Sequence, residues 1–130
     1  MREFYVIVHE GDLDLVSPTK RSIDVLEQLD DIRRTHPEDY KEIKVVRPEY
    51  LVPDGLPASS QDLRVIVCGA YAKRDPNGEA CCNAQVRALR RRGYNAELHP
   101  TACMYADPLD MIRDIQSTLA RNLERMQGSP

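Results

Sequence analysis

Short apolar runs alternate along the chain with segments whose apolar residues follow helical spacing. The runs lie at residues 4–8, 43–46, 63–68 and 94–98. Each has the length of a strand, and the third is apolar throughout, as in a strand buried on both faces. Strands that alternate with helices are typical of a parallel sheet covered by those helices. We therefore predict an α/β fold, a three-layer α/β/α domain with a mostly parallel, Rossmann-like sheet.

The first predicted helix follows Ser17 and Pro18, which suit the N-cap and the first helical position. It ends before His36-Pro37, because proline disfavours helical backbone in the residue before it. Its apolar stripe consists of Ile23, Leu26, Leu29 and Ile32. A second helix is expected to begin at the adjacent residues 81 and 82 and to end at Gly93, a typical C-cap residue. The proline-rich residues 47–61 predict a loop.

The last predicted helix begins near Asp107-Pro108 and carries apolar residues along one face. They are Ile112, Ile115, Leu119, Leu123 and Met126. Steps of three and four residues are typical of a seam between paired helices, and also of a face that covers a sheet. We expect a homo-oligomer held partly by this helix, with packing on the chain's own sheet as the alternative.

Composition and charge narrow the class of protein. The chain has 130 residues, of which 42% are hydrophobic and 30% are charged, as in an ordinary globular protein. We therefore predict a single domain over residues 1–130. The formal net charge of -3 gives no general attraction to nucleic acid or anionic lipid, so neither is expected as a partner. The first residues lack the pattern of a signal peptide, and no stretch approaches the roughly 18 apolar residues of a membrane span. We expect a cytoplasmic protein.

Two of the four cysteines, Cys81 and Cys82, are adjacent in the first turn of the second predicted helix. Uneven spacing in a chain of this length does not indicate a disulfide framework, so reduced thiols are expected. From Cys82, helical steps reach the apolar residues Val86 and Leu89, a stripe that predicts burial against the sheet. From Cys81, similar steps reach a mixed face that we expect to be more accessible, formed by Gln85, Ala88 and Arg92.

The position of Cys81 favours a reactive thiol. Unpaired N–H groups in the first turn of a helix stabilise a thiolate, and they can also stabilise an oxyanion on a carbonyl group under attack. Lys73 and Arg74, in the preceding loop, are expected to add positive charge. The alternative is that both cysteines pack against the sheet and carry no chemistry.

A family resemblance covers residues 63–105. The stretches "VIVCGAYA" and "EACCNAQVRALRRRGYNAELHPTAC" resemble the second half of the isochorismatase-like cysteine hydrolases, which include nicotinamidases. In that family an apolar strand ends in glycine, and a helix then opens with the nucleophilic cysteine and ends at Gly-Tyr. The resemblance implies that Cys81 is the nucleophile of a small hydrolase acting on an amide or related small molecule. Cys82 falls where the family usually has an apolar residue.

The resemblance also implies an aspartate base after the first strand and a lysine after a strand in mid-chain. Here His9 and Glu10 close the first strand, and Asp12 follows slightly later. His9 suits the role of base because imidazole titrates near neutral pH. Arg47 is the nearest candidate for the cation, although a guanidinium cannot transfer a proton. We therefore name Cys81, His9, Asp12 and Arg47 as candidate catalytic residues, with the choice of base left open.

Other features give weaker indications. His99 and Cys103 with the cysteine pair lack the spacing of a zinc site, so we expect no metal, and no glycine loop indicates a nucleotide cofactor. The run from Arg90 to Arg92 is interpreted as a solvated helix end. The rival to the hydrolase is a catalytically inactive α/β protein that binds a ligand or assembles with partners. In both cases a ligand is expected at the carboxyl ends of the strands, near His9, Arg47 and Gly69.

Overall fold

The computed structural model describes residues 1–14, 20–44, 47 and 50–128, except for the side chains of Asp12 and Asp14. Ser17 and Pro18, the predicted start of the first helix, lie outside the described residues. The elements in chain order are β1 (Arg2–Val8), a 3-10 helix η1 (Glu10–Asp14), α1 (Lys20–Thr35), β2 (Tyr40–Ile43), β3 (Leu63–Ala72), α2 (Cys81–Arg91), β4 (Asn95–Tyr105) and α3 (Pro108–Gly128).

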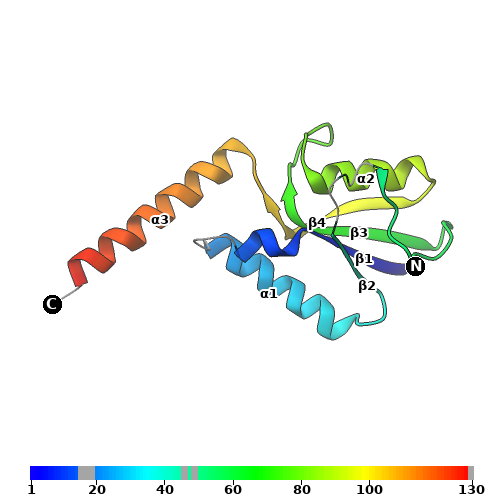
Figure 1. Cartoon of the computed structure of the whole chain (residues 1–130), viewed down its shortest axis with the longest axis horizontal. Helices are drawn as coiled ribbons and strands as arrows, with labels where there is room; N and C mark the ends of the chain where they lie inside the picture. The colour runs from blue at the N-terminus through cyan, green and yellow to red at the C-terminus, as the bar shows by residue number, and fades with distance from the viewer. Residues whose placement is uncertain (15–19, 45–46, 48–49, 129–130) are drawn as a thin grey trace.

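The four strands form one parallel sheet in the order β2-β1-β3-β4. The predicted α/β fold with a parallel sheet is therefore confirmed. Helices α1 and α2 pack on opposite faces of this sheet (Figure 1). On the α2 side, alternate residues of β1 and β3 meet Cys82, Val86 and Leu89. On the α1 side, the intervening strand residues meet Val25, Leu29 and Ile32.

All four strands have bounds that differ from the predicted ones, and β1 begins two residues earlier while β3 continues four residues further. β2 was expected at residues 43–46 but spans Tyr40–Ile43, and Val45 and Val46 lie outside the described residues. β4 continues past Leu98 to Tyr105 because residues 99–102 bulge opposite Cys68 and pairing then resumes. The ring nitrogen Nδ1 of His99 accepts hydrogen bonds from the backbone of Thr101 (3.1 Å) and Ala102 (2.9 Å) in this bulge. β4 lies at the edge of the sheet, where a bulge with Pro100 is tolerated.

The stripe predicted on α1 is partly wrong. Leu29 and Ile32 are buried as expected, but Ile23 is exposed, and Ser22 and Val25 are buried instead. The buried residues are spaced by three and four positions, so the helix is turned slightly from the predicted face.

The connection from β2 to β3 covers part of α2. Among its described residues there is no strand or α-helix, as the prolines predicted. The connection is bonded to α2 and to the residue before β4: Gln85 Nε2 donates to the Leu51 carbonyl oxygen (2.8 Å), and the Tyr94 hydroxyl donates to that of Pro57 (2.8 Å). Val52 and Leu56 pack on the α2 side of the core. These residues shield a face of α2 from solvent.

Helix α3 does not cover the sheet. It leaves the body at the end of β4 and extends away from it (Figure 1). All five residues of its predicted stripe are between 51% and 77% exposed, so packing on the chain's own sheet is excluded for them. Within the part of the chain that is described, no helix is long and apolar enough to cross a membrane.

Candidate functional site at the carboxyl ends of beta strands 1 and 3

The carboxyl ends of β1 and β3 lie side by side, with Val8 paired to Gly69. The chain leaves β1 toward α1 on one face and leaves β3 toward α2 on the other. In a parallel sheet, this reversal opens a crevice in which ligands bind. Gly69 permits the close approach of the strands, because its φ is +108° and a Cβ there would lie 2.0 Å from the Val8 carbonyl oxygen.

The first turn of α2 lies at the level of this edge. Cys82 Sγ is 3.6 Å from the carbonyl oxygen of Cys68, and Cys68 pairs with Ile7 near the end of β1. Cys81 belongs to the same helical turn as Cys82. The structure therefore brings Cys81 and His9, the residue after β1, to the same end of the sheet.

The four cysteines, all among the described residues, form no disulfide and have different environments. Cys68, Cys82 and Cys103 are buried, whereas Cys81 is half-buried. Burial, with a smaller contribution from Cys103, raises the pKa of Cys68 well above its ordinary value. The pKa of Cys82 is also raised well above its ordinary value, mainly by a hydrogen bond with Cys103 and, as the second cause, by burial. Cys81 is thus less buried than the other three, although it still packs against the α2 side of the core, and the predicted division between Cys81 and Cys82 is confirmed for burial.

The N-terminus of α2 has no side-chain cap. The N-cap residue is Ala80, in an extended conformation, and it makes no capping hydrogen bond through a side chain. The N–H groups of the first turn therefore have no hydrogen-bond acceptor on the side chain of Ala80. These groups can stabilise a negative charge that develops beside Cys81.

The candidate bases differ in their surroundings. His9 is half-buried and has a left-handed backbone (φ 47°), which turns the chain from β1 into η1. Glu10 forms an ion pair with Arg33 of α1, so its carboxylate is engaged on the opposite face from α2. The backbone of Asp12 lies within η1, and its side chain is not described. Of these three residues, Glu10 has its carboxylate engaged elsewhere and is the least suited to serve as the base.

Arg47 is exposed on the connection after β2, where its carbonyl oxygen accepts a hydrogen bond from the Tyr50 backbone (3.2 Å). Nothing in these contacts directs its guanidinium toward the first turn of α2.

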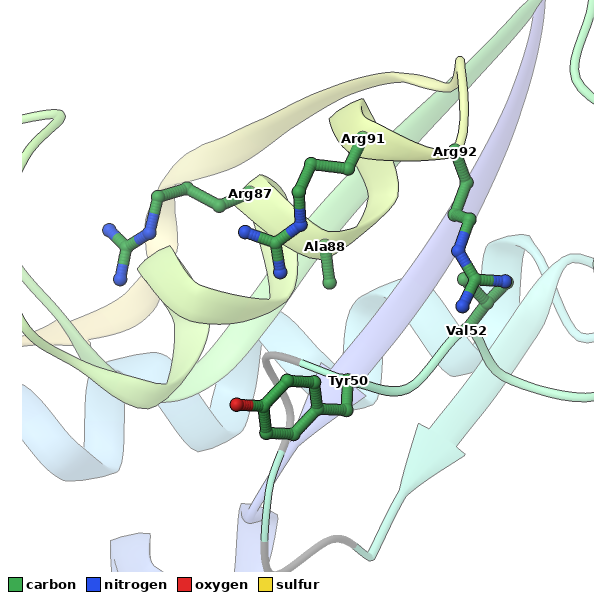
Figure 2. A pocket seen from close by; sticks show the side chains of 6 residues that line it. All are labelled: Tyr50, Val52, Arg87, Ala88, Arg91 and Arg92. Carbon is green, nitrogen blue, oxygen red and sulfur yellow. The ribbon is translucent and has the colours of Figure 1, made fainter.

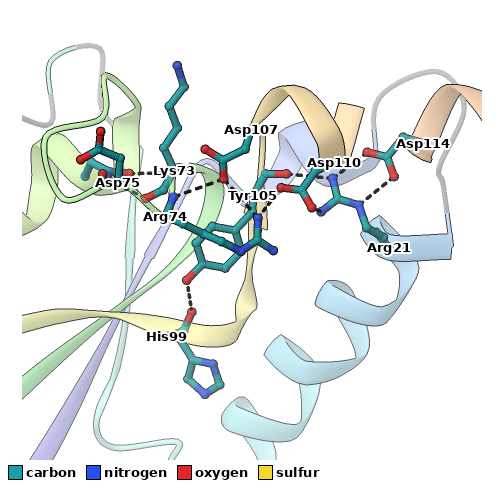
Figure 3. Close-up of polar contacts among 10 residues, drawn as sticks. Arg21, Lys73, Arg74, Asp75, His99, Tyr105, Asp107, Asp110 and Asp114 are labelled. Atoms are coloured by element: carbon teal, nitrogen blue, oxygen red, sulfur yellow. Dashed lines mark hydrogen bonds and ion pairs between the residues drawn. The ribbon is translucent and has the colours of Figure 1, made fainter. Parts of the chain in front are cut away.

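The expectation that Arg74 adds positive charge near Cys81 is wrong. Figure 3 shows its guanidinium beside Asp107 and Asp110, at the start of α3, and over the ring of Tyr105 at 4.5 Å. Two carboxylates neutralise its charge there. Lys73 is held through its backbone instead: Asn83 accepts a hydrogen bond from its N–H (2.8 Å) and donates one to its carbonyl oxygen (3.0 Å).

A polar network that the sequence did not predict fixes the start of α3 (Figure 3). Arg21 of α1 donates two hydrogen bonds to Asp114 (2.7 and 2.6 Å) and one to the Tyr105 carbonyl oxygen (2.8 Å). It also lies 3.5 Å from the buried carboxylate of Asp110, which Arg74 contacts from the other side. The acidic residues at the start of the last helix could be recognised in the sequence. Their partners, Arg21 and Arg74, could not be identified because they are distant along the chain.

The face of α2 that continues from Cys81 is less accessible than predicted. Gln85 and Ala88 are buried under the β2–β3 connection, while Arg92 is exposed as expected. The Gln85 Nε2 group has its partner at Leu51, but its Oε1 atom has no hydrogen-bond partner among the described residues. Leaving such an acceptor unpaired costs about 1–3 kcal/mol, so this residue is held in place at some expense of stability.

A second hollow lies near the other end of α2 (Figure 2). Its volume is about 370 Å³, and it is lined by Tyr50, Val52, Arg87, Ala88, Arg91 and Arg92. Guanidinium groups on one wall can hold a small anionic group. Arg87 and Arg91 lie roughly 9 and 15 Å along the helix from Cys81, at 1.5 Å per residue, so the hollow adjoins the C-terminal half of α2.

Among the described residues, no group of three or more histidine, cysteine, aspartate or glutamate side chains is placed to hold a metal ion. His99 instead stabilises the bulge in β4, and burial lowers its pKa. Comparisons with protein-family models, curated proteins and solved structures found no match for this chain.

Proposed function

We propose that this chain is a cytoplasmic, cysteine-dependent hydrolase of a small amide or related molecule, and that it works as a homo-oligomer. The observation that carries the proposal is the position of Cys81. It is a half-buried thiol in the first turn of α2, at the carboxyl end of the parallel sheet, while the other three cysteines are buried. The resemblance of residues 63–105 to isochorismatase-like cysteine hydrolases supports the same assignment.

In the proposed reaction, His9 accepts the proton of the Cys81 thiol, and the thiolate attacks the carbonyl carbon of the amide. The N–H groups of the first turn of α2 stabilise the oxyanion. His9 returns the proton to the leaving nitrogen, so that an amine departs and a thioester remains on Cys81. A water molecule, deprotonated by His9, then attacks the thioester and releases the acid and the free thiol.

The test measures ammonia release from a panel of small primary amides, nicotinamide among them. We expect Cys81→Ser to abolish release and Cys82→Ala to retain it, because Cys82 belongs to the core. His9→Asn is the informative base variant, since asparagine tolerates the left-handed backbone at that position. Release that survives in Cys81→Ser would contradict the proposal.

A second candidate is the catalytically inactive protein that assembles with partners. The exposed apolar stripe of α3 favours it. Absence of turnover across the panel, with Cys81 still open to alkylation, would support this candidate over the hydrolase.

A further inference from the structure

Helix α3 presents a continuous apolar stripe to solvent. The stripe consists of Ile112 (51% exposed), Ile115 (60%), Leu119 (56%), Leu123 (55%) and Met126 (77%). Isolated apolar residues are common on protein surfaces, but a contiguous patch of this kind marks an interaction site. Arg21 and Arg74 hold the first turns of the helix through Asp110 and Asp114, so the stripe stays away from the sheet.

The spacing of the stripe is symmetric about Leu119. Ile115 and Leu123 lie four residues to either side of it, and Ile112 and Met126 lie seven residues to either side. When two such helices pair antiparallel with Leu119 opposite Leu119, Ile112 faces Met126 and Ile115 faces Leu123. Every apolar residue of the stripe then meets an apolar residue. A two-fold dimer requires this self-complementarity of one surface.

The charges on α3 are arranged to permit self-pairing. The residues that flank the stripe along its middle are uncharged: Gln116, Thr118, Ala120 and Asn122. At 3.6 residues per turn, all the charged residues fall on the opposite half of the helix surface. They are Asp110, Arg113, Asp114, Arg121, Glu124 and Arg125. A two-fold axis brings identical surfaces together, so a charged flank would repel its own copy, whereas this uncharged flank does not.

The base of α3 adds area to the contact. A hollow of about 470 Å³ adjoins the stripe there, and its lining includes Tyr71, Met104, Met111 and Ile115. A helix of this length spans about 30 Å, and a helix pair alone falls short of the roughly 800 Å² per partner of a typical stable interface. In the antiparallel register, the end of the second helix lies beside this hollow and extends the buried surface.

We infer that the stripe of α3 binds α3 of a second copy of this chain, antiparallel, with a two-fold axis at Leu119. The inference concerns the assembly and does not depend on the chemistry of Cys81.

Light scattering on the full chain tests the assembly. We expect the parent to be a dimer and Leu119→Glu to be a folded monomer with the circular dichroism spectrum of the parent, because the residue is exposed within one copy. The matched control is Ser117→Glu, which adds the same charge on the other side of α3 and should remain dimeric. A monomeric parent up to the limit of its solubility, or a dimeric Leu119→Glu variant, would overturn the inference.

Cysteine cross-linking tests the register, in a Cys81→Ser background with copper phenanthroline as the oxidant. Leu119→Cys should form a disulfide with its own copy. Ile112→Cys alone should not, whereas a mixture of Ile112→Cys and Met126→Cys should cross-link between the two variants. Efficient cross-linking of Ile112→Cys with itself would indicate parallel pairing and exclude the antiparallel arrangement.

Discussion

The sulfur of Cys82 lies 3.6 Å from the carbonyl oxygen of Cys68, at the level where β1 ends beside β3. This contact fixes the first turn of α2 against the sheet. It buries one thiol of the adjacent pair and leaves its neighbour, Cys81, half-buried at the carboxyl end of the sheet. Cys82 therefore contributes to the packing of this turn, whereas Cys81 is the thiol that we propose to be reactive.

Cys82→Asp should destabilise the fold by about 3–5 kcal/mol, because it places an unpaired charge in a closely packed core. Cys81→Ser should change the free energy of unfolding by less than about 1 kcal/mol, since its side chain is half-buried. Urea unfolding of the two variants beside the parent measures both values. Equal midpoints for Cys82→Asp and the parent would show that the assignment of the helix faces is wrong.

Alkylation should distinguish the four thiols. Iodoacetamide at neutral pH is expected to modify Cys81 well before the buried cysteines, because a thiolate must be both formed and reached. The raised pKa values of Cys68 and Cys82 keep those thiols protonated under these conditions. Mass mapping over time gives the order, and slow modification of Cys81 would end its role as a nucleophile.

Stability should fall in alkaline solution. The pKa values of Cys68 and Cys82 are raised in the folded chain, above the ordinary value of 9.0. Their contribution is therefore complete below about pH 9 and is lost as the pH rises toward the folded values, since the unfolded thiols ionise first. Between the unfolded and the folded pKa, each of the two thiols lowers the free energy of unfolding by about 1.4 kcal/mol per pH unit.

Urea midpoints at pH 8 and pH 10 measure this loss, and Cys68→Ala should reduce it. A parent that is equally stable at both values would contradict the burial of these thiols.

Gly69→Ala should prevent correct folding. The φ of +108° is unfavourable for alanine, and its Cβ would overlap the Val8 carbonyl oxygen at 2.0 Å. Gly11→Ala is the matched control, because a Cβ there meets nothing within 4 Å. Circular dichroism and thermal unfolding of the two purified variants provide the comparison. A Gly69→Ala protein as stable as the control would show that β1 and β3 approach each other less closely.

Local patterns predicted the parts of the structure that depend on local spacing. The burial of Cys82 and the greater exposure of Cys81 follow from the helical period and the position of the apolar strands. The roles of Gln85 and Arg74 could not be predicted in this way. Gln85 is buried by Leu51 and its neighbours, and Arg74 is neutralised by residues at the start of α3. Both effects depend on which distant segments of the chain meet. The local pattern of apolar and charged residues does not specify those contacts.

The same limit applies to β4. The strand was expected to end at Leu98, but Nδ1 of His99 accepts two backbone hydrogen bonds in the bulge, after which β4 pairs with β3 again. The position of the candidate site was easier to predict from the sequence than the side-chain contacts around it. The ends of β1 and β3 follow from the alternation of elements, whereas the engagement of Glu10 by Arg33 appears once α1 is docked.

Residues 73–75 connect two elements that otherwise belong to separate parts of the molecule. Their backbone is bonded to Asn83 in the first turns of α2, and the Arg74 guanidinium is bonded to the first turn of α3. A torque applied along α3 by a partner helix would be transmitted to the N-terminus of α2 through bonded groups rather than through solvent. Helix α3 is about 30 Å long, so a force on its free end would act on the bonded residues at its base. Asp110 lies at the base of α3, and the chain of bonded groups ends at Asn83, two residues after Cys81.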